Sequence, residues 1–134
     1  MFLNSALKYL EKGCSVIPVN KDTKKPYIAW AEFQTRYATK DEIEKWAKDF
    51  PDAAIGLVCG RISDLTVIDC DTPEAVELIE SLLPEGLECP VAQTPRGGRH
   101  YFFKYCPELT SVNRVREAID VKSEGGYVIA SFLM

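Results

Sequence analysis

Residues 94–105 read Thr-Pro-Arg-Gly-Gly-Arg-His-Tyr-Phe-Phe-Lys-Tyr, and the expected fold can be built outward from them. Pro95 and the pair Gly97-Gly98 are typical of a tight turn, and the aromatic residues that follow His100 favour a strand. The segment therefore predicts a β-hairpin that carries two arginines and the only histidine of the chain. Taken alone, such a segment is more often a solvated basic loop.

A strand with two acidic residues is expected before this hairpin. Residues 65–70 predict a buried strand that contains Asp69 and is followed by Asp71. Side chains at i and i+2 of a strand point to the same face, so the two carboxylates should lie side by side. They repel each other unless a cation neutralises them, and oxygen ligands favour Mg²⁺ or Mn²⁺ over Zn²⁺. The alternative is a solvated strand end whose acids favour the next helix.

A third acidic residue is expected on a strand after the hairpin. Residues 118–121 predict this strand, in which Asp120 and the following Lys122 share one face. Three carboxylates from two strands can hold one or two metal ions beside a triphosphate. By itself, Asp120 is more simply explained by a salt bridge to Lys122.

The glycine turn is a candidate anion-binding site. Arg96 and Arg99 flank Gly97-Gly98, and glycine backbone can approach a ligand closely. His100 could donate a hydrogen bond to a phosphate oxygen, although a single histidine is more often structural. Lys24 and Lys25, in the loop at residues 20–26, could also reach phosphate, but exposed loop lysines usually have no specific role.

Composition and charge limit the class of protein. The 134 residues fit one globular domain, and no apolar run is long enough to span a bilayer or to form a signal-peptide core, so we expect a cytoplasmic protein. Five cysteines without a Cys-x-x-Cys pair make a zinc site improbable. Residues 1–40 carry a net charge of +4, residues 41–90 carry −10 and residues 91–134 carry +2, which excludes a uniformly basic nucleic-acid surface.

The remaining pattern predicts an α+β fold, with helices early and antiparallel strands late. We expect helices near residues 4–13, 39–50 and 72–83. We expect strands at 14–19, 54–59, 65–70, 91–94, 100–105, 118–121 and 127–132. Pro18 indicates an edge or an end for the first of these strands, and residues 106–113 are expected to be irregular. The last two strands are predicted to form a hairpin around Gly125-Gly126.

These motifs together resemble a known family. Val67-Ile-Asp-Cys-Asp71, Thr94-Pro-Arg-Gly-Gly-Arg-His100 and Ile119-Asp120 look like motifs I, II and III of the archaeo-eukaryotic primase superfamily. The closest resemblance is to the bifunctional primase–polymerase N-terminal domain of plasmid, phage and prophage replication proteins. Lys25-Pro26, Trp30, Trp46 and the segment Gly125-Gly126-Tyr127 agree with it, so the resemblance covers nearly the whole chain.

The resemblance implies metal-dependent, template-directed nucleotidyl transfer by an RRM-like antiparallel sheet packed against a small N-terminal α/β module. Asp69, Asp71 and Asp120 would bind Mg²⁺ or Mn²⁺, and the substrates would be a single-stranded DNA template and an NTP or dNTP. The residues implied in binding the nucleotide are Arg96, Gly97, Gly98, Arg99, His100 and Lys122. Many members are fused to a helicase or ATPase domain.

Two departures from the family pattern lie at the end of the chain and in motif II. Family domains usually continue beyond the third motif, so we expect residues 1–134 to be one primase–polymerase domain shortened at its C-terminus. Residues 130–133 also lack the Pro-Ser segment often found there. Gly98 stands where the wider superfamily commonly has a small hydroxyl residue, although Gly-Gly is common in the close family.

Two other functions remain open at this point. A metal-dependent nuclease or phosphohydrolase could use the same three aspartates, but it would need a further base to activate water. A non-catalytic nucleotide- or nucleic-acid-binding module of a replication protein would bind its ligand without turnover. The shortened C-terminus is the feature that favours this last reading.

Overall fold

The computed structural model describes residues 2–95, 97–109 and 111–130. Within these residues the chain forms two antiparallel sheets. The smaller sheet has the order β1-β2-β8, with strands at Ser15–Val19, Ala54–Val58 and Tyr127–Ile129. The larger has the order β4-β5-β3-β7-β6, with strands at Val91–Gln93, Arg99–Phe103, Thr66–Cys70, Ile119–Lys122 and Val112–Arg116. The helices are α1 (Phe2–Glu11), α2 (Lys40–Asp49) and α3 (Pro73–Leu82), with 3₁₀ turns at Ala31–Gln34 and Arg61–Ser63.

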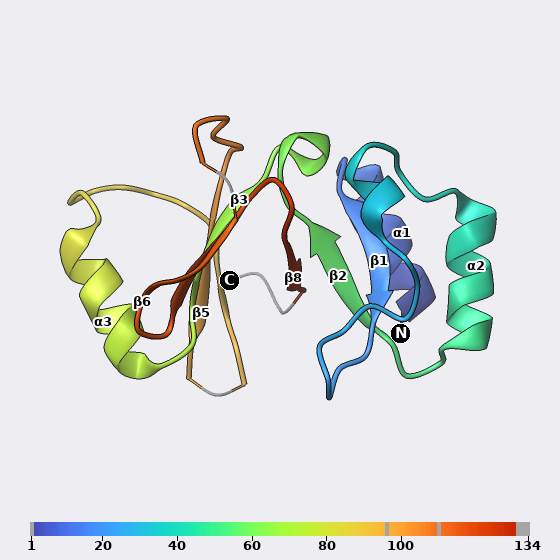
Figure 1. The fold of residues 1–134 in the computed structure, drawn as a ribbon, viewed down its shortest axis with the longest axis horizontal. Helices are drawn as coiled ribbons and strands as arrows, with labels where there is room; N and C mark the ends of the chain where they lie inside the picture. Colours follow the sequence, from blue (N-terminus) through green and yellow to red (C-terminus); the bar gives the residue numbers. More distant parts are fainter. Residues whose placement is uncertain (1, 96, 110, 131–134) are drawn as a thin grey trace.

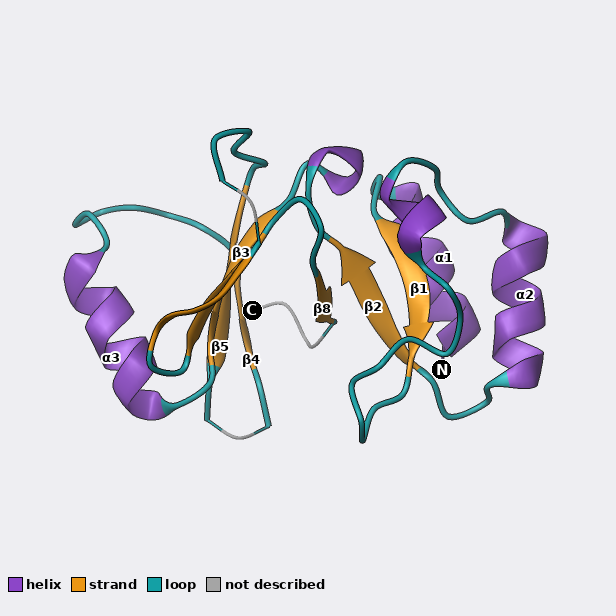
Figure 2. Cartoon of the chain, in the orientation of Figure 1, coloured by secondary structure: helices purple, strands orange, loops and turns teal. Residues whose placement is uncertain are grey.

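The helices lie on the two outer flanks and the sheets lie between them. Figure 1 shows α1 and α2 beside β1 on one flank and α3 against the larger sheet on the other. The colouring by secondary structure in Figure 2 shows the strands of both sheets in the middle of the molecule. None of the described helices has the length and apolar character that a membrane span requires.

The α+β class and most of the expected elements are confirmed. Thr39 forms a capping box with Glu42 at the start of α2, and the Thr72 hydroxyl accepts a hydrogen bond from the Ala75 amide at the start of α3. Pro18 lies in β1, which is an edge strand, where a missing backbone donor is tolerated. Local capping and turn chemistry therefore determine where these elements begin.

The two faces of the larger sheet are different. Cys70, Tyr101 and Ile119 pack with α3 in one hydrophobic cluster. Val67 and Phe102 belong instead to the cluster that the smaller sheet shares with α1 and α2. Because side chains alternate along a strand, the residues in phase with Val67 and Phe102 face away from α3 and toward the smaller sheet.

The hairpin predicted around Gly125-Gly126 is wrong. β7 pairs with β3 and β6, whereas β8 leaves that sheet and pairs with β2 in the smaller one. Gly125 has φ +87°, and the Gly126 carbonyl accepts a hydrogen bond from the Cys59 amide, so the turn directs the chain across to β2. A period-two pattern identifies a strand but not its partner. The expected end of this strand, residues 131–132, lies outside the described residues.

The irregular segment predicted at residues 106–113 ends too late, because β6 already begins at Val112. β6 pairs with β7 through Arg116 and Ile119, so the turn between them consists of Glu117 and Ala118. Ala118 has φ +61°, a conformation that glycine or asparagine usually marks in a sequence. Without either residue, the sequence carries no signal for this hairpin.

Gly98 allows the β4–β5 turn to pack against the end of β3. A Cβ atom at this position would collide with the Cys70 carbonyl oxygen and come within 2.8 Å of the Thr94 hydroxyl. We expect Gly98→Ala to lower the free energy of unfolding by about 1–3 kcal/mol, because the added methyl group must displace backbone. Chemical denaturation measures this change, with Gln93→Ala, at the exposed position of β4, as the control. Equal stability of Gly98→Ala and the native protein would contradict the packing.

Candidate functional site

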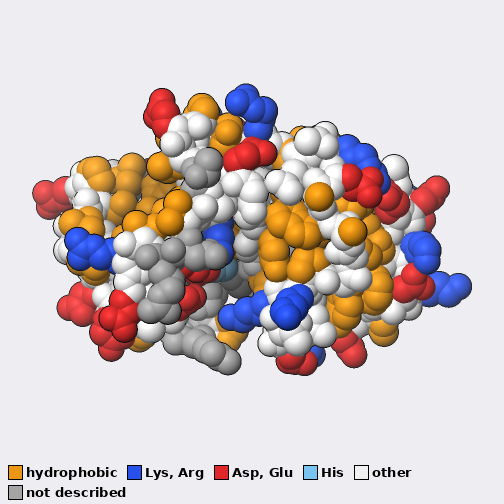
Figure 3. Space-filling model, in the orientation of Figure 1, with side chains coloured by type: hydrophobic (Ala, Val, Ile, Leu, Met, Phe, Trp, Pro, Cys, Tyr) orange, Lys and Arg blue, Asp and Glu red, His pale blue; other side chains and the backbone are white. Residues whose placement is uncertain are grey.

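A cleft of about 1390 Å³ separates the two sheets. One wall consists of residues from β3, β5 and β7, and the other consists of residues from β8 and from the loop that follows β1. The space-filling view in Figure 3 shows a hollow near the centre of the molecule. Small-molecule sites commonly occupy about 300–1,000 Å³, so the cleft has room for a nucleotide and for part of a second substrate.

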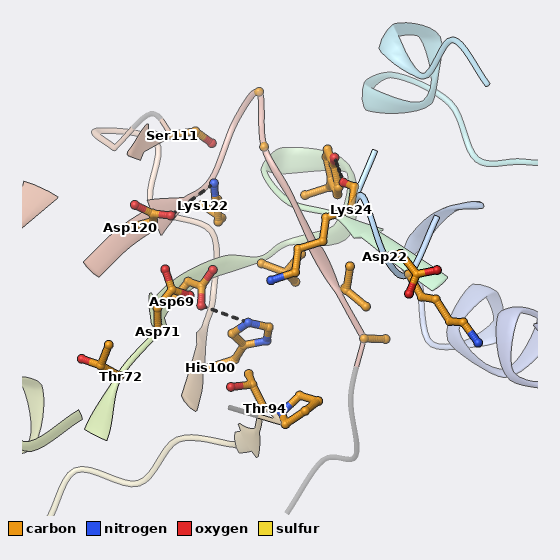
Figure 4. A pocket seen from close by; sticks show the side chains of 18 residues that line it. Asp22, Lys24, Asp69, Asp71, Thr72, Thr94, His100, Ser111, Asp120 and Lys122 are labelled. Carbon is orange, nitrogen blue, oxygen red and sulfur yellow. Dashed lines mark hydrogen bonds and ion pairs between the residues drawn. The ribbon is translucent and has the colours of Figure 1, made fainter. Parts of the chain in front are cut away.

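Asp69, His100 and Asp120 form a row across three adjacent strands. In the antiparallel register, Asp69 of β3 is the Cα partner of His100 on β5 and also of Asp120 on β7. All three line the cleft, together with Asp71. Figure 4 shows the three acidic side chains and His100 gathered on the same side of the sheet. The predicted acids therefore do converge on one cleft.

His100 is held against Asp69. Its Nε2 atom lies 3.2 Å from Asp69 Oδ1, and the histidine side chain is only 8% exposed. The other ring nitrogen, Nδ1, is buried and has no hydrogen-bond partner among the described residues. A buried polar atom without a partner costs about 1–3 kcal/mol, so a ligand that hydrogen-bonds to Nδ1 would recover that energy.

Asp120 lies beside a cation. Lys122 Nζ is 3.7 Å from Asp120 Oδ2, and both side chains line the cleft with about a fifth of their surface exposed. The two residues are separated by one position on β7, which places them on the same face as predicted. Lys122 is thus positioned next to the acids, where it can offset part of their charge.

Asp71 experiences the repulsion of the other acids. The cleft removes part of the water around Asp71, which raises the pKa of its carboxyl group, and the charges of Asp69 and Asp120 raise it further. The positive charges of Lys24 and His100 act in the opposite direction. Asp71 is nevertheless an exposed residue by its accessible surface, so solvent screens these effects and the shift is modest.

The donor set suits a divalent cation, although the carboxylates are turned apart. No three His, Cys, Asp or Glu side chains in the described part of the chain lie close enough together to ligate one ion. Asp69 is directed to His100 and Asp120 to Lys122, and these contacts keep the like charges of the two carboxylates apart. Carboxylate oxygens are nonetheless the ligands that Mg²⁺ and Mn²⁺ prefer. Asp69 and Asp120 are directly opposite each other on adjacent strands, and the Cβ atoms of such pairs are about 4.5–5.5 Å apart, which makes the two carboxylates candidates to share one ion.

The residues of the glycine turn are divided between the two faces of the sheet. Arg99 lies on the α3 face, where its guanidinium group binds Glu80 at 3.0 Å and lies over the Tyr101 ring. It is therefore not brought into the cleft with His100. Gly97 has φ +82°, as a turn requires, and Gly98 packs under the end of β3. The expectation for Arg96 lies outside the described residues.

Several residues of the cleft were not singled out by sequence reasoning. They include Lys21 and Asp22 from the loop after β1, Thr94, Ser111 and Tyr127. Lys24 and Lys25 were both considered as phosphate contacts, and of the two only Lys24 lines the cleft, opposite the acids (Figure 4). The basic run at residues 21–25 was the available signal, but its position depends on how the two sheets face each other.

Comparison with family models identifies the family to which this chain belongs. The family model described as bifunctional DNA primase/polymerase, N-terminal (Prim-Pol) matches residues 6–132. The chain belongs to this family. Prim-Pol membership implies the nucleotidyl transfer of a primase or polymerase, with a DNA template and nucleotides as substrates. A search of curated proteins finds no match.

The raised pKa of Asp71 predicts how stability depends on pH in this Prim-Pol domain. At pH 7 without divalent metal, Asp71→Asn should raise the melting temperature by roughly 1–4 °C, because it removes a charge that the folded state disfavours. The difference should shrink as the pH falls through the raised pKa toward the ordinary value of 3.8, where the carboxyl group is protonated in both states.

Thermal denaturation in a chelating buffer across this pH range measures the effect. Asp52→Asn, in the exposed turn after α2, is the matched control and should leave the melting temperature unchanged. A melting temperature of Asp71→Asn below that of the native protein at pH 7 would contradict the repulsion.

Proposed function

We propose that this chain is a primase–polymerase domain that extends a nucleic-acid strand on a single-stranded DNA template with an NTP or dNTP. The observation that carries the proposal is the row of His100, Asp69 and Asp120 in one cleft of a Prim-Pol family member. Acidic and phosphate-binding groups must lie side by side for nucleotidyl transfer, because the reacting phosphate is bound next to the metal ions.

The three carboxylates have the role of metal ligands in this proposal. Asp69, Asp71 and Asp120 would hold Mg²⁺ or Mn²⁺, which lowers the pKa of the attacking 3′-hydroxyl and stabilises the charge of the leaving pyrophosphate. The repulsion felt by Asp71 supports this role, since a divalent cation would relieve it. His100 and Lys122 would contact the phosphates of the incoming nucleotide, and Gly97 and Gly98 would keep the turn close to them.

The domain and its setting are part of the same proposal. Residues 1–134 would form one primase–polymerase domain. In it, β3, β5 and β7 would belong to the RRM-like catalytic sheet, with α3 packed on one face, and β1, β2, α1 and α2 would form the small N-terminal module. The setting would be the replication of plasmid, phage or prophage DNA, with a helicase or ATPase as the partner.

A non-catalytic binding module is the second candidate. It is favoured by the existing contacts of the acids, because Asp69 already contacts His100 and Asp120 already contacts Lys122 in the described structure. Such a module would bind nucleotide or DNA through His100 and Lys122 without incorporating it. Incorporation by the native protein separates the two functions.

The polymerase proposal predicts a strong dependence on Asp69. Asp69→Asn keeps the shape of the side chain and removes the charge, so it should lower the incorporation rate on the order of 100-fold or more. The measurement is extension of a primed single-stranded template with labelled nucleotides in Mn²⁺ or Mg²⁺. Asp52→Asn is the control for a loss of negative charge elsewhere.

Three outcomes would contradict the proposal in different ways. Nucleotide incorporation by Asp69→Asn at the native rate would show that Asp69 is not a required metal ligand. Shortening of the labelled strand by the native protein would indicate a nuclease. Nucleotide or template binding without any incorporation by the native protein would indicate the non-catalytic module.

A further inference from the structure

The wall opposite the acids carries positive charge. Lys21 and Lys24 line the cleft from the loop after β1, and Figure 4 shows the Lys24 side chain extending toward the carboxylates. Neither lysine forms an ion pair with another residue in the described ranges. The acidic wall carries Asp69, Asp71 and Asp120 beside Lys122, and the opposite wall carries Lys21 and Lys24 beside Asp22. Each wall therefore has an excess of one charge, and the two excesses are of opposite sign.

The loop that carries Lys24 is closed by its own hydrogen bonds. The Asn20 side-chain oxygen accepts from the amides of Asp22 at 2.8 Å and Thr23 at 3.0 Å. The Asn20 amide donates to the Lys25 carbonyl at 2.8 Å, and the Lys24 amide donates to the Asn20 carbonyl at 2.7 Å. These hydrogen bonds hold the backbone of the loop, so the Cα atom of Lys24 is in place before any ligand arrives.

Lys24 itself is held in an unfavourable backbone conformation. Its φ angle is +63°, a left-handed conformation that costs about 1–2 kcal/mol for a residue with a Cβ atom. The Tyr127 hydroxyl donates to the Lys24 carbonyl at 2.5 Å, and the Tyr127 ring packs edge-on against Trp30. Strain that the surrounding contacts maintain is common at ligand-binding positions.

We propose that Lys24 binds the polyphosphate of the incoming nucleotide from the wall opposite the acids, and that Tyr127 is its positioning residue. The inference rests on the proposed function, because the acids would fix the reacting end of the same nucleotide. Metal ions bound by the acidic wall are also partly neutralised by its carboxylates, so they do not balance the whole charge of a triphosphate. The end of the triphosphate that is farther from the acids therefore needs a cation from the opposite wall. The ammonium of Lys24 is suited to this, as it forms no ion pair within the described residues.

A DNA phosphate could supply the same chemistry, but the position of Lys24 favours the nucleotide. Lys24 lines the same cleft as Asp71, and its side chain extends toward the carboxylates (Figure 4). The phosphates next to the acids during nucleotidyl transfer are those of the nucleotide, whereas the template is bound through more distant phosphates. If Lys24 binds the nucleotide, its substitution weakens triphosphate binding. If it binds a DNA phosphate, the substitution weakens oligonucleotide binding instead.

The test is Lys24→Ala, compared with Lys25→Ala, which removes the same charge from the next position but does not line the cleft. Calorimetry with inorganic triphosphate and Mg²⁺ should show an affinity lower on the order of tenfold for Lys24→Ala and unchanged for Lys25→Ala. Binding of a single-stranded oligonucleotide should be unchanged in both. Lys24→Arg should recover most of the triphosphate affinity.

Tyr127→Phe tests the positioning role. It removes the hydroxyl group that holds the Lys24 carbonyl and keeps the ring that packs on Trp30. We expect the KM for nucleotide to rise a few-fold while kcat is unchanged. In the double variant with Lys24→Ala, Tyr127→Phe should add no further loss, because its effect acts through Lys24.

The outcomes separate this inference from the proposed function. Equal triphosphate affinity of Lys24→Ala and the native protein, or an equal loss in Lys25→Ala, would overturn the role of Lys24 even if nucleotides are incorporated. Loss of oligonucleotide binding with triphosphate binding intact would assign Lys24 to the template instead. Triphosphate binding that depends on Lys24 in a protein without incorporation would leave this inference standing and overturn the polymerase activity.

Discussion

The cross-strand position of Asp69 is the constraint on which the cleft depends. β3 is the central strand of the larger sheet, so Asp69 has His100 on one side and Asp120 on the other. A shift of one residue in either register would turn one of these partners to the α3 face. The burial of Cys70, Tyr101 and Ile119 against α3 prevents that shift, and the packing of the core thereby fixes the positions of the polar groups.

The cleft also explains the uneven charge of the sequence. The acidic middle of the chain contributes Asp69 and Asp71, whereas the basic first forty residues contribute Lys21 and Lys24 to the opposite wall. Opposite charges that face each other across a water-filled gap attract only weakly, but both can act on a ligand that contains phosphate and metal. The net charge of −4 is therefore a sum that includes acidic and basic groups on opposite walls of one site.

The sequence predicted the parts of the site that depend on local rules. Asp69 and Asp71 were placed on one face by the period of a strand, and the same period could have excluded Arg99 from the cleft, since it is adjacent to His100. The pairing of β8 with β2 could not be predicted, because alternation in residues 127–129 fits either sheet. The position of Lys24 depends on that pairing and on its contact with Tyr127, so only the folded chain reveals it.

We propose that Asp69 and Asp120 share one cation in this cleft. A crystal structure of the protein with Mn²⁺ and a nucleotide tests this, because anomalous scattering locates the metal. We predict a Mn²⁺ peak bound by oxygens of both residues, with His100 Nε2 released from Asp69. A peak bound elsewhere, with the Asp69–His100 contact intact in the presence of nucleotide, would contradict this account.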